Sequence, residues 1–412
     1  MANMQNIKKT LKGNTMILIL LAVMLFFQVL IVAADKGSLF APANITNLIN
    51  QNAWVVILAT GMLLCILTGG NIDLSVGSVI CLVGAVAGIL IVNMGWPVLP
   101  SIIICLIVGA LIGAWHGFFI AYVHIPPFIC TLSGMLLWRG VALILLNGMT
   151  ISPFPESFTN IFNSYLPGLF LAQPPEEMSD EAYDLLIEHN ESITFVVTMI
   201  VSLACCFATV VSSFLSRVSK QKKGYSVPSF GSFVGKQVVL CAAIMIVGTL
   251  LAKDKGLPVI LIILGIVVGI YSYYTKNTVP GRYLYAIGGN EKAARLSGVN
   301  TDNVMMFAYT NMGFIAGICG LVCAARLNSA APTVGQSYEM DAIASCFIGG
   351  ASAYGGTGSV GGAVVGAIFM GVLNNGMSIL GVDSNWQRAV KGLVLLLAVI
   401  FDVVSKKKKS GK

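Results

Sequence analysis

The chain is a succession of apolar runs, each close in length to the thickness of a lipid bilayer. A helix needs about 20 apolar residues to cross the hydrocarbon core of a membrane, and twelve segments approach or exceed that length. They lie near residues 16–34, 48–68, 72–92, 99–122, 128–148, 192–216, 237–252, 258–275, 304–325, 340–355, 358–380 and 386–403. The pattern predicts an all-α polytopic membrane protein. The ends of the runs within 340–380 are the least defined, because this region is rich in glycine.

The composition agrees with this class. Hydrophobic residues make up 57% of the chain and charged residues only 10%, whereas a soluble protein carries about 25% charged residues. The first run, 16–34, follows a basic tail over residues 1–15. A secretory signal peptide is the alternative, since Val32-Ala33-Ala34 resembles a cleavage site, but the run is long for the apolar part of such a peptide. We therefore expect it to remain as a span.

Basic residues are distributed unevenly between alternate loops. With the N-terminus in the cytosol, the inside segments carry 17 Lys and Arg residues and the outside segments carry five. The inside set is Lys8, Lys9, Lys12, Arg217, Lys220, Lys222, Lys223, Lys236, Lys276, Arg282, Lys292, Arg295, Lys406, Lys407, Lys408, Lys409 and Lys412, and the outside set is Lys36, Lys253, Lys255, Arg326 and Arg388. Because cytosolic loops are enriched in Lys and Arg, we expect both termini, including the basic tail 404–412, to be cytosolic. The net charge of +7 therefore reflects topology and predicts no nucleic-acid partner.

The spacing of the runs suggests a repeat with an insertion. The loop 149–191 has no Lys or Arg and eight acidic residues, so it is predicted to be external. Residues 192–252 are predicted to form an inserted pair of spans with a basic cytosolic hairpin. Residues 48–148 and 304–403 each hold four spans and begin on opposite sides of the membrane, which is the arrangement of an inverted repeat. The alternative is that any hydrophobic protein divides in this way, because the two blocks share little sequence similarity.

A polar segment at 276–303 interrupts the apolar pattern. Asn290 is a good helix N-cap and Gly298 a good C-terminal stop, so we expect a helix of about eight residues, roughly 12 Å long, between them. Such a helix is too short and too polar to span a bilayer. The small side chains of Ala293 and Ala294 leave one face with little bulk, which suits docking into a groove on a soluble partner.

Two glycine-rich segments resemble nucleotide-binding motifs but lack their context. Residues 356–361 match the dinucleotide fingerprint, yet no strand precedes them, and residues 231–236 resemble a Walker A loop that lacks the final Ser or Thr. The ten cysteines lie in apolar segments and the three histidines are scattered. We therefore expect no disulfide, no metal, no catalytic residue and no cofactor in this chain, with any ATP bound by a partner subunit. Glycines four residues apart predict close helix packing; they are Gly109, Gly113, Gly117, Gly362 and Gly366.

Five charged residues fall within or beside the predicted spans: Asp73, Arg139, Glu339, Asp341 and Lys391. Charges in hydrocarbon are costly, so these residues are functional candidates. They form no chain of carboxylates along one helix, which leaves a proton relay as an alternative without support. Asp73 has a second interpretation, as the N-cap of the helix that follows it.

Several short motifs of this chain carry a family resemblance when they are taken as a set. They are Gly69 to Ser78, the Pro-Phe-Ile-Cys-Thr-Leu run at 127–132, Gly281-Arg282-Tyr283 with residues 286–290, residues 338–344, the glycines at 349–350 and 355–362, and Leu373-Asn374-Asn375-Gly376. As a set they resemble the monosaccharide ABC permeases, the family of the ribose, xylose and galactose permeases. The resemblance covers about 48–148 and 258–403. It is greatest to the longer multiple-monosaccharide and xylose-type members, with Asn147 to Ile151 and Pro153-Phe154-Pro155 after the fifth span.

The resemblance implies the ten-span fold of the vitamin B12 importer type, to which residues 192–252 add a pair. It also implies that 276–303 is the coupling segment that docks on the ATPase. The family pattern Glu-Ala-Ala-x-x-x-Gly is interrupted here by Lys292. The residues expected to couple to the ATPase are Asn290, Glu291, Ala293, Ala294, Arg295 and Gly298.

The implied activity is sugar import by alternating access, without covalent chemistry in this chain. The implied partners are a second permease copy, cytosolic ATPase subunits, an external sugar-binding protein and the lipid of a bacterial cell membrane, inner or cytoplasmic. A neutral aldohexose or aldopentose is expected, because the membrane charges are few and of mixed sign. Residues expected along the path are Asp73, Phe128, Thr131, Ser133, Trp138, Asn147, Asn374 and Asn375.

Other interpretations stay open. Several of these path residues could instead merely satisfy contacts between helices. A proton-coupled secondary transporter with twelve spans would need no ATPase. A permease of the same family for another solute, such as branched-chain amino acids, would share the fold and the coupling segment.

Overall fold

The computed structural model describes residues 15–171, 180–227 and 229–410. Over these ranges the chain consists of helices and connecting segments, with strand-like pairing confined to two isolated bridges. The predicted all-α class is therefore confirmed. Residues 1–14 of the predicted N-terminal tail, 172–179 of the predicted external loop and the last two residues of the chain lie outside the described residues.

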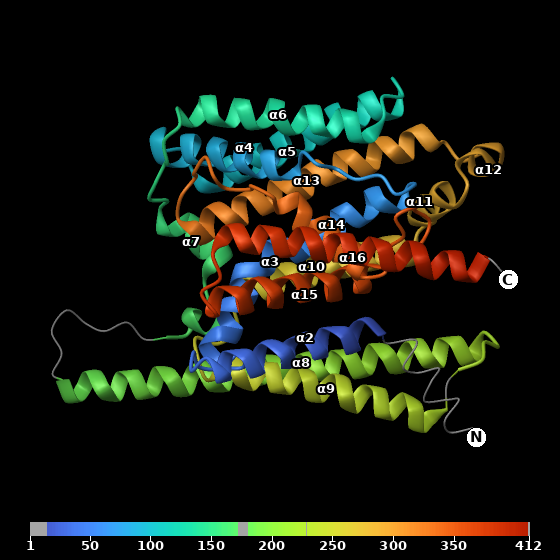
Figure 1. The fold of residues 1–412 in the computed structure, drawn as a ribbon. Helices are drawn as coiled ribbons and strands as arrows, with labels where there is room; N and C mark the ends of the chain where they lie inside the picture. Colours follow the sequence, from blue (N-terminus) through green and yellow to red (C-terminus); the bar gives the residue numbers. More distant parts are fainter. Residues whose placement is uncertain (1–14, 172–179, 228, 411–412) are drawn as a thin grey trace. The chain divides into compact units, whose positions relative to one another are not determined.

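Helices follow one another along the described parts of the chain (Figure 1). They are α2 (Thr15–Ala33), α3 (Pro42–Leu67), α4 (Val76–Gly88) continued by the π-helical turn η1 (Ile89–Asn93), α5 (Val98–Ala121), α6 (Pro127–Leu146), α7 (Glu156–Asn163), the 3-10 turn η2 (Leu166–Leu169), α8 (Asp180–Lys222), α9 (Phe230–Ala252), α10 (Val259–Asn277), α11 (Val279–Gly289), α12 (Glu291–Leu296), α13 (Thr301–Leu327), α14 (Tyr338–Ile348), α15 (Val360–Ile379) and α16 (Ser384–Ser410).

Ten helices of the described chain are long and apolar enough to cross a membrane. These are α2, α3, α4 with η1, α5, α6, α8, α9, α10, α13 and α15. The prediction of ten core spans plus an inserted pair would give twelve, whereas the described chain has ten in all, with α8 and α9 among them. The predicted span at 386–403 lies in α16, which is not among the ten. The predicted span at 340–355 is wrong: α14 has 11 residues, or about 16 Å, roughly half the thickness of a bilayer core. The reason is local, because Gly350, Gly355 and Gly356 adopt positive φ and end the helical path.

The chain forms two compact units. The first comprises Met1–Gly37, Leu48–Asn163 and Ile262–Lys412, and the second Ser38–Asn47 and Ser164–Leu261. In the second unit, α8 packs against α9, in the region predicted to hold an inserted pair. Helix α8 has 43 residues and is about 65 Å long, so it exceeds the roughly 30 Å of a bilayer core by a wide margin.

Helices of the first unit approach one another through glycines. A Cβ at Gly113 would lie 2.3 Å from the carbonyl oxygen of Tyr309, and one at Gly313 would lie 2.2 Å from that of Gly109, so α5 and α13 touch backbone to backbone. In the same way a Cβ at Gly366 on α15 would lie 1.9 Å from the carbonyl oxygen of Ser345 on α14. The predicted close packing at these glycines is confirmed, and it is a packing mode typical of membrane helices.

Helices α4 and α14 occupy matching places in the two predicted repeats. Each is preceded by a non-helical segment, 68–75 and 328–337 respectively. Helix α4 packs against α5 and α6, and α14 packs against α15 and α16. Helix α4 also packs against α13, and 304–403 holds two of the ten candidate spans rather than four, so the inverted repeat stays a prediction.

Candidate functional site

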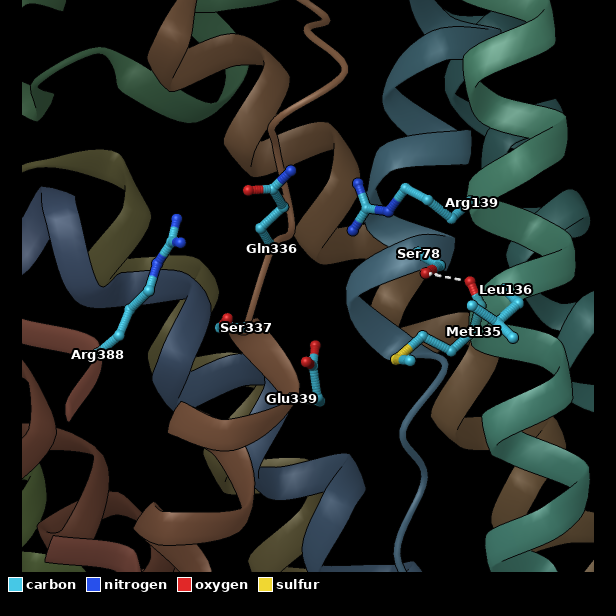
Figure 2. A pocket seen from close by; sticks show the side chains of 8 residues that line it. All are labelled: Ser78, Met135, Leu136, Arg139, Gln336, Ser337, Glu339 and Arg388. Carbon is cyan, nitrogen blue, oxygen red and sulfur yellow. Dashed lines mark hydrogen bonds between the residues drawn. The ribbon is translucent and has the colours of Figure 1, made fainter. Parts of the chain in front are cut away.

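A polar pocket lies in the first unit where α4 and α14 begin (Figure 2). Its volume is about 270 Å³, just below the roughly 300–1,000 Å³ of sites for drug-sized ligands. It is lined by Ser78, Met135, Leu136, Arg139, Gln336, Ser337, Glu339 and Arg388. Six of these eight side chains are polar or charged, which is unusual for a cavity between membrane helices.

The start of α4 is fixed by local hydrogen bonds. Asp73 accepts from the amide of Ser75 at 2.8 Å and from its hydroxyl at 2.6 Å, and Ser75 is the residue before the first turn of α4. Asp73 thus bonds close to the helix start, but the N-cap position itself belongs to Ser75. Two residues into the helix, Ser78 donates its hydroxyl to the carbonyl oxygen of Met135 on α6 at 2.7 Å.

The start of α14 lies directly against the start of α4. A Cβ at Gly77 would lie 2.1 Å from the carbonyl oxygen of Gly335 and 2.6 Å from Oε2 of Glu339. Gly335 has a φ of +78°, and Ser337, the N-cap of α14, has a φ of +63°. Glycine at 77 is therefore required by the close approach, and glycine at 335 by both the close approach and its positive φ.

Opposite charges face this pocket without pairing. Arg139 uses Nη1 to donate to the carbonyl oxygens of Val334 at 2.7 Å and Pro332 at 3.3 Å. Glu339 is 8% exposed. Within the described chain, neither residue forms an ion pair. Figure 2 shows the guanidinium of Arg139 and the carboxylate of Glu339 extending from α6 and α14 into the same space.

A separate ion pair joins three helices beside the pocket. Lys391 of α16 donates to Oδ2 of Asp341 on α14 at 2.9 Å, and Asn374 of α15 donates to the same oxygen at 3.4 Å. The side chain of Asp341 is 2% exposed and that of Lys391 is 20% exposed. This contact links α14, α15 and α16, and removing one partner would leave an uncompensated buried charge.

None of the residues predicted along the path lines the pocket. Asp73 precedes α4, four of the residues lie on α6, Asn147 caps its C-terminus, and two lie on α15; the full set is Asp73, Phe128, Thr131, Ser133, Trp138, Asn147, Asn374 and Asn375. Thr131 is buried and donates to the carbonyl oxygen of Pro127. Phe128 is exposed. Their roles in transport stay predictions.

The sequence did contain a signal for the pocket. Arg139 and Glu339 are two of the five charges that fall within or beside the predicted spans, and Ser78 and Glu339 belong to motifs that carry the family resemblance. Gln336 and Arg388 also line the pocket. Neither belongs to those five charges or to the family motifs, so no signal in the sequence pointed to them.

The predicted coupling segment forms two short helices, α11 and α12 (Figure 1). Thr278 caps α11 by accepting from the amide of Gly281 at 3.1 Å. Asn290 caps α12 by accepting from the amide of Ala293 at 3.0 Å, as the sequence predicts. Helix α12 has six residues rather than about eight, and the chain leaves it at Gly298 with a φ of +85°.

The exposed face of α12 carries charge and one large apolar side chain. Arg295 forms ion pairs with Asp302 at 2.7 Å and with Glu291 at 3.8 Å. Leu296 is 90% exposed, whereas Ala294 is buried against the protein. The rest of the described chain therefore leaves Leu296 on this face uncovered.

Helix α11 rests on the core through its backbone. A Cβ at Gly288 would lie 1.9 Å from the carbonyl oxygen of Leu67, the last residue of α3, and 2.3 Å from the amide nitrogen of Gly356. Gly356 in turn donates to the Leu67 carbonyl at 3.0 Å. Tyr285 donates its hydroxyl to the carbonyl oxygen of Gly358 at 3.2 Å. Burial raises the pKa of that hydroxyl, which keeps it protonated as a donor.

Metal-binding groups are not gathered in the described part of the chain. No group of three or more His, Cys, Asp or Glu residues is placed to hold a metal ion there. The cysteines are free thiols, and most of them are buried.

Comparison with known proteins identifies the family. The model described as branched-chain amino acid transport system / permease component matches residues 44–399. The xylose transport system permease protein XylH of Escherichia coli K12 is 38% identical over 395 residues, which cover 95% of this chain and 92% of that protein. XylH of Haemophilus influenzae is 35% identical, covering 95% and 96%. The ribose import permease protein RbsC of Escherichia coli K12 is 34% identical, covering 92% and 91%.

No solved structure matched the chain significantly. The family match extends from the third residue of α3 into α16. Since that match covers most of the chain and the relatives align over nearly their whole length, the chain belongs to the family of ABC transporter permease components that includes the xylose and ribose permeases.

Proposed function

We propose that this chain is the membrane-spanning subunit of an ATP-driven importer for a monosaccharide, and that it forms the path along which the sugar crosses. The observation that carries the proposal is the similarity to xylose and ribose permeases over more than nine-tenths of both chains. Similarity of this extent includes the spans, the coupling segment and the inserted α8–α9 pair. The chain itself performs no covalent chemistry.

The proposed assembly has two permease copies, two cytosolic ATPase subunits and an external binding protein that delivers the sugar. The exposed face of α12 supports the ATPase contact, because a short capped helix with a protruding Leu296 suits a groove on a partner. ATP would be bound and hydrolysed by the partner. Closure of the ATPase would then drive alternating access through α11 and α12.

The proposed location is a bacterial cell membrane, with both termini in the cytosol. The excess of Lys and Arg on the predicted inside segments supports this orientation. It places α11 and α12 on the cytosolic side, where an ATPase can reach them.

The proposed solute is a neutral aldopentose or aldohexose, with xylose and ribose foremost because the similar permeases are named for them. A branched-chain amino acid is the second candidate, because the family model carries that description. The two candidates differ in charge and in the amount of apolar surface that they must bury.

Uptake in a deletion strain tests the proposal. The strain would express this chain with its ATPase and binding protein and receive labelled D-xylose, D-ribose, D-galactose or L-leucine. Accumulation of at least one sugar but not of leucine is expected, and leucine uptake without sugar uptake would overturn the assignment. In proteoliposomes with a proton gradient and no ATPase, the chain alone is expected to accumulate no sugar; accumulation there would favour the secondary-transporter alternative.

A further inference from the structure

We propose that the pocket between the starts of α4 and α14 is a binding station for the sugar inside the membrane, in which Glu339 and Arg139 bind neighbouring hydroxyl groups from opposite sides. This inference rests on the proposed function, since it names where the transported solute is held. The position of Arg139 along α6 shows how deep the pocket lies in the membrane. Arg139 lies about 18 Å along α6 from Pro127 and about 10 Å from Leu146, so the pocket is well inside a span.

Glu339 is a buried carboxylate without an ion-pair partner in the described chain. Buried charges in proteins are normally paired, and Asp341 with Lys391 shows the usual arrangement a short distance along the chain. Glu339 is also buried, yet it forms no ion pair in the described chain, and its carboxylate accepts a hydrogen bond from its own backbone. Two carbonyl oxygens hold Arg139, and the close approach of the backbone at Gly77 fixes α14. Arg139 and Glu339 thus line one cavity without pairing, and Arg388 lines it as well.

Sugar hydroxyl groups have the hydrogen-bonding chemistry to bind both Glu339 and Arg139. A sugar hydroxyl both donates and accepts, so adjacent hydroxyls can donate to a carboxylate and accept from a guanidinium. The first turns of α4 and α14 add two helix N-termini at the pocket, which favour oxygen acceptors. Hydrogen bonds to charged groups are the stronger ones. A solute with hydroxyls on successive carbons can therefore bond to both Glu339 and Arg139.

The lining of the pocket suits a sugar better than a branched-chain amino acid. A zwitterion could also place its carboxylate on Arg139 and its ammonium on Glu339. A branched-chain amino acid must in addition bury an apolar side chain, and Met135 and Leu136 are the pocket's only apolar residues in the described chain. That side chain could form no hydrogen bond with Gln336, Ser337 or Arg388, which also line the pocket. The pocket therefore favours the polyol.

Cysteine protection tests occupancy without relying on transport. Gln336→Cys would place a thiol in the pocket, on an exposed position, in a background in which the exposed Cys205 is replaced by Ser. D-xylose or D-ribose at millimolar concentration is expected to slow labelling by a hydrophilic methanethiosulfonate reagent in the full transporter. Thr333→Cys, exposed in the same segment but outside the lining, is the matched control and should react at the same rate with and without sugar.

Transport kinetics test whether Glu339 binds the sugar. Glu339→Ala is expected to raise the KM for sugar uptake at least about tenfold, and the isosteric Glu339→Gln about threefold, because Gln keeps a hydrogen-bonding group but loses the charge. Glu156→Gln, the same change at an exposed position on α7, should leave KM unchanged. Membrane levels and basal ATPase activity of the complex should match those of the unchanged protein.

The outcomes are distinguishable. If the unchanged complex imports sugar but neither protection nor the KM change is seen, the station is wrong and the proposed function stands. If L-leucine protects position 336 and is imported while sugars do neither, both proposals are overturned. If the complex imports nothing, protection by sugar still supports the station, and its absence rejects it.

Discussion

Gly288 of α11 lies so close to the carbonyl oxygen of Leu67 that a methyl group on its Cα would sit 1.9 Å from that oxygen. The same methyl would lie 2.3 Å from the amide nitrogen of Gly356. The predicted coupling segment therefore meets the end of α3 and the segment between α14 and α15 without side chains between them. A displacement of α11 must move these two backbones with it, because no flexible side chain can absorb it.

This contact predicts that Gly288→Ala impairs coupling. The added methyl must push α11 away from α3, at a cost of about 1–3 kcal/mol, so uptake is expected to fall at least about tenfold. Gly289→Ala is the matched control, because a Cβ at this neighbouring position meets nothing within 4 Å. Uptake and membrane level of the two variants would be compared. Equal uptake by both would show that the close contact does not matter.

The end of α12 gives a second prediction. Gly298 has a φ of +85°, where a branched side chain costs about 1–2 kcal/mol. Gly298→Leu is expected to distort the predicted coupling segment and abolish uptake with normal membrane insertion, whereas Gly298→Asn should retain most uptake because Asn tolerates this conformation. Glu291→Lys, which reverses a charge on the exposed face, should also abolish uptake. Normal transport by Gly298→Leu or by Glu291→Lys at the usual protein level would argue against this segment as the coupling site.

The ion pair between Asp341 and Lys391 gives a third prediction, about stability. Asp341→Leu or Lys391→Met alone leaves one buried charge without a partner and is expected to cost about 3–5 kcal/mol. The double variant removes both charges and should recover most of that loss. Thermal unfolding of the protein in detergent would measure the cycle. Additive losses in the double variant would mean that the two charges do not interact.

Helix α8 gives a fourth prediction, about topology. Glu188 and Lys222 are 34 residues apart on one continuous helix, or about 51 Å, which exceeds the roughly 30 Å of a bilayer core. In a background with Cys205→Ser, a cysteine at 188 should be labelled in intact cells by an impermeant maleimide, and one at 222 only after permeabilisation. The reverse pattern would invert the proposed orientation.

The sequence alone determined the class of protein and the positions of most spans. Apolar composition over about 20 residues is a local property, so α2, α3, α5 and α15 lie where the pattern predicts them. The cap at Asn290 was also readable, because an N-cap bonds to an amide only three residues away. Glycines at helical spacing predicted that α5 packs closely on a neighbour.

Only the tertiary structure decided what those elements meet. Glycine at 288 is compatible with many environments, and its contact with Leu67 depends on two segments 221 residues apart. The pocket gathers Ser78, Arg139, Glu339 and Arg388 from four separate helices, and the shortness of α14 follows from turns that the hydropathy pattern does not register. Hydrophobicity places a residue in the membrane, but it is directionless. Which polar groups share one cavity is set by the packing of the helices around them.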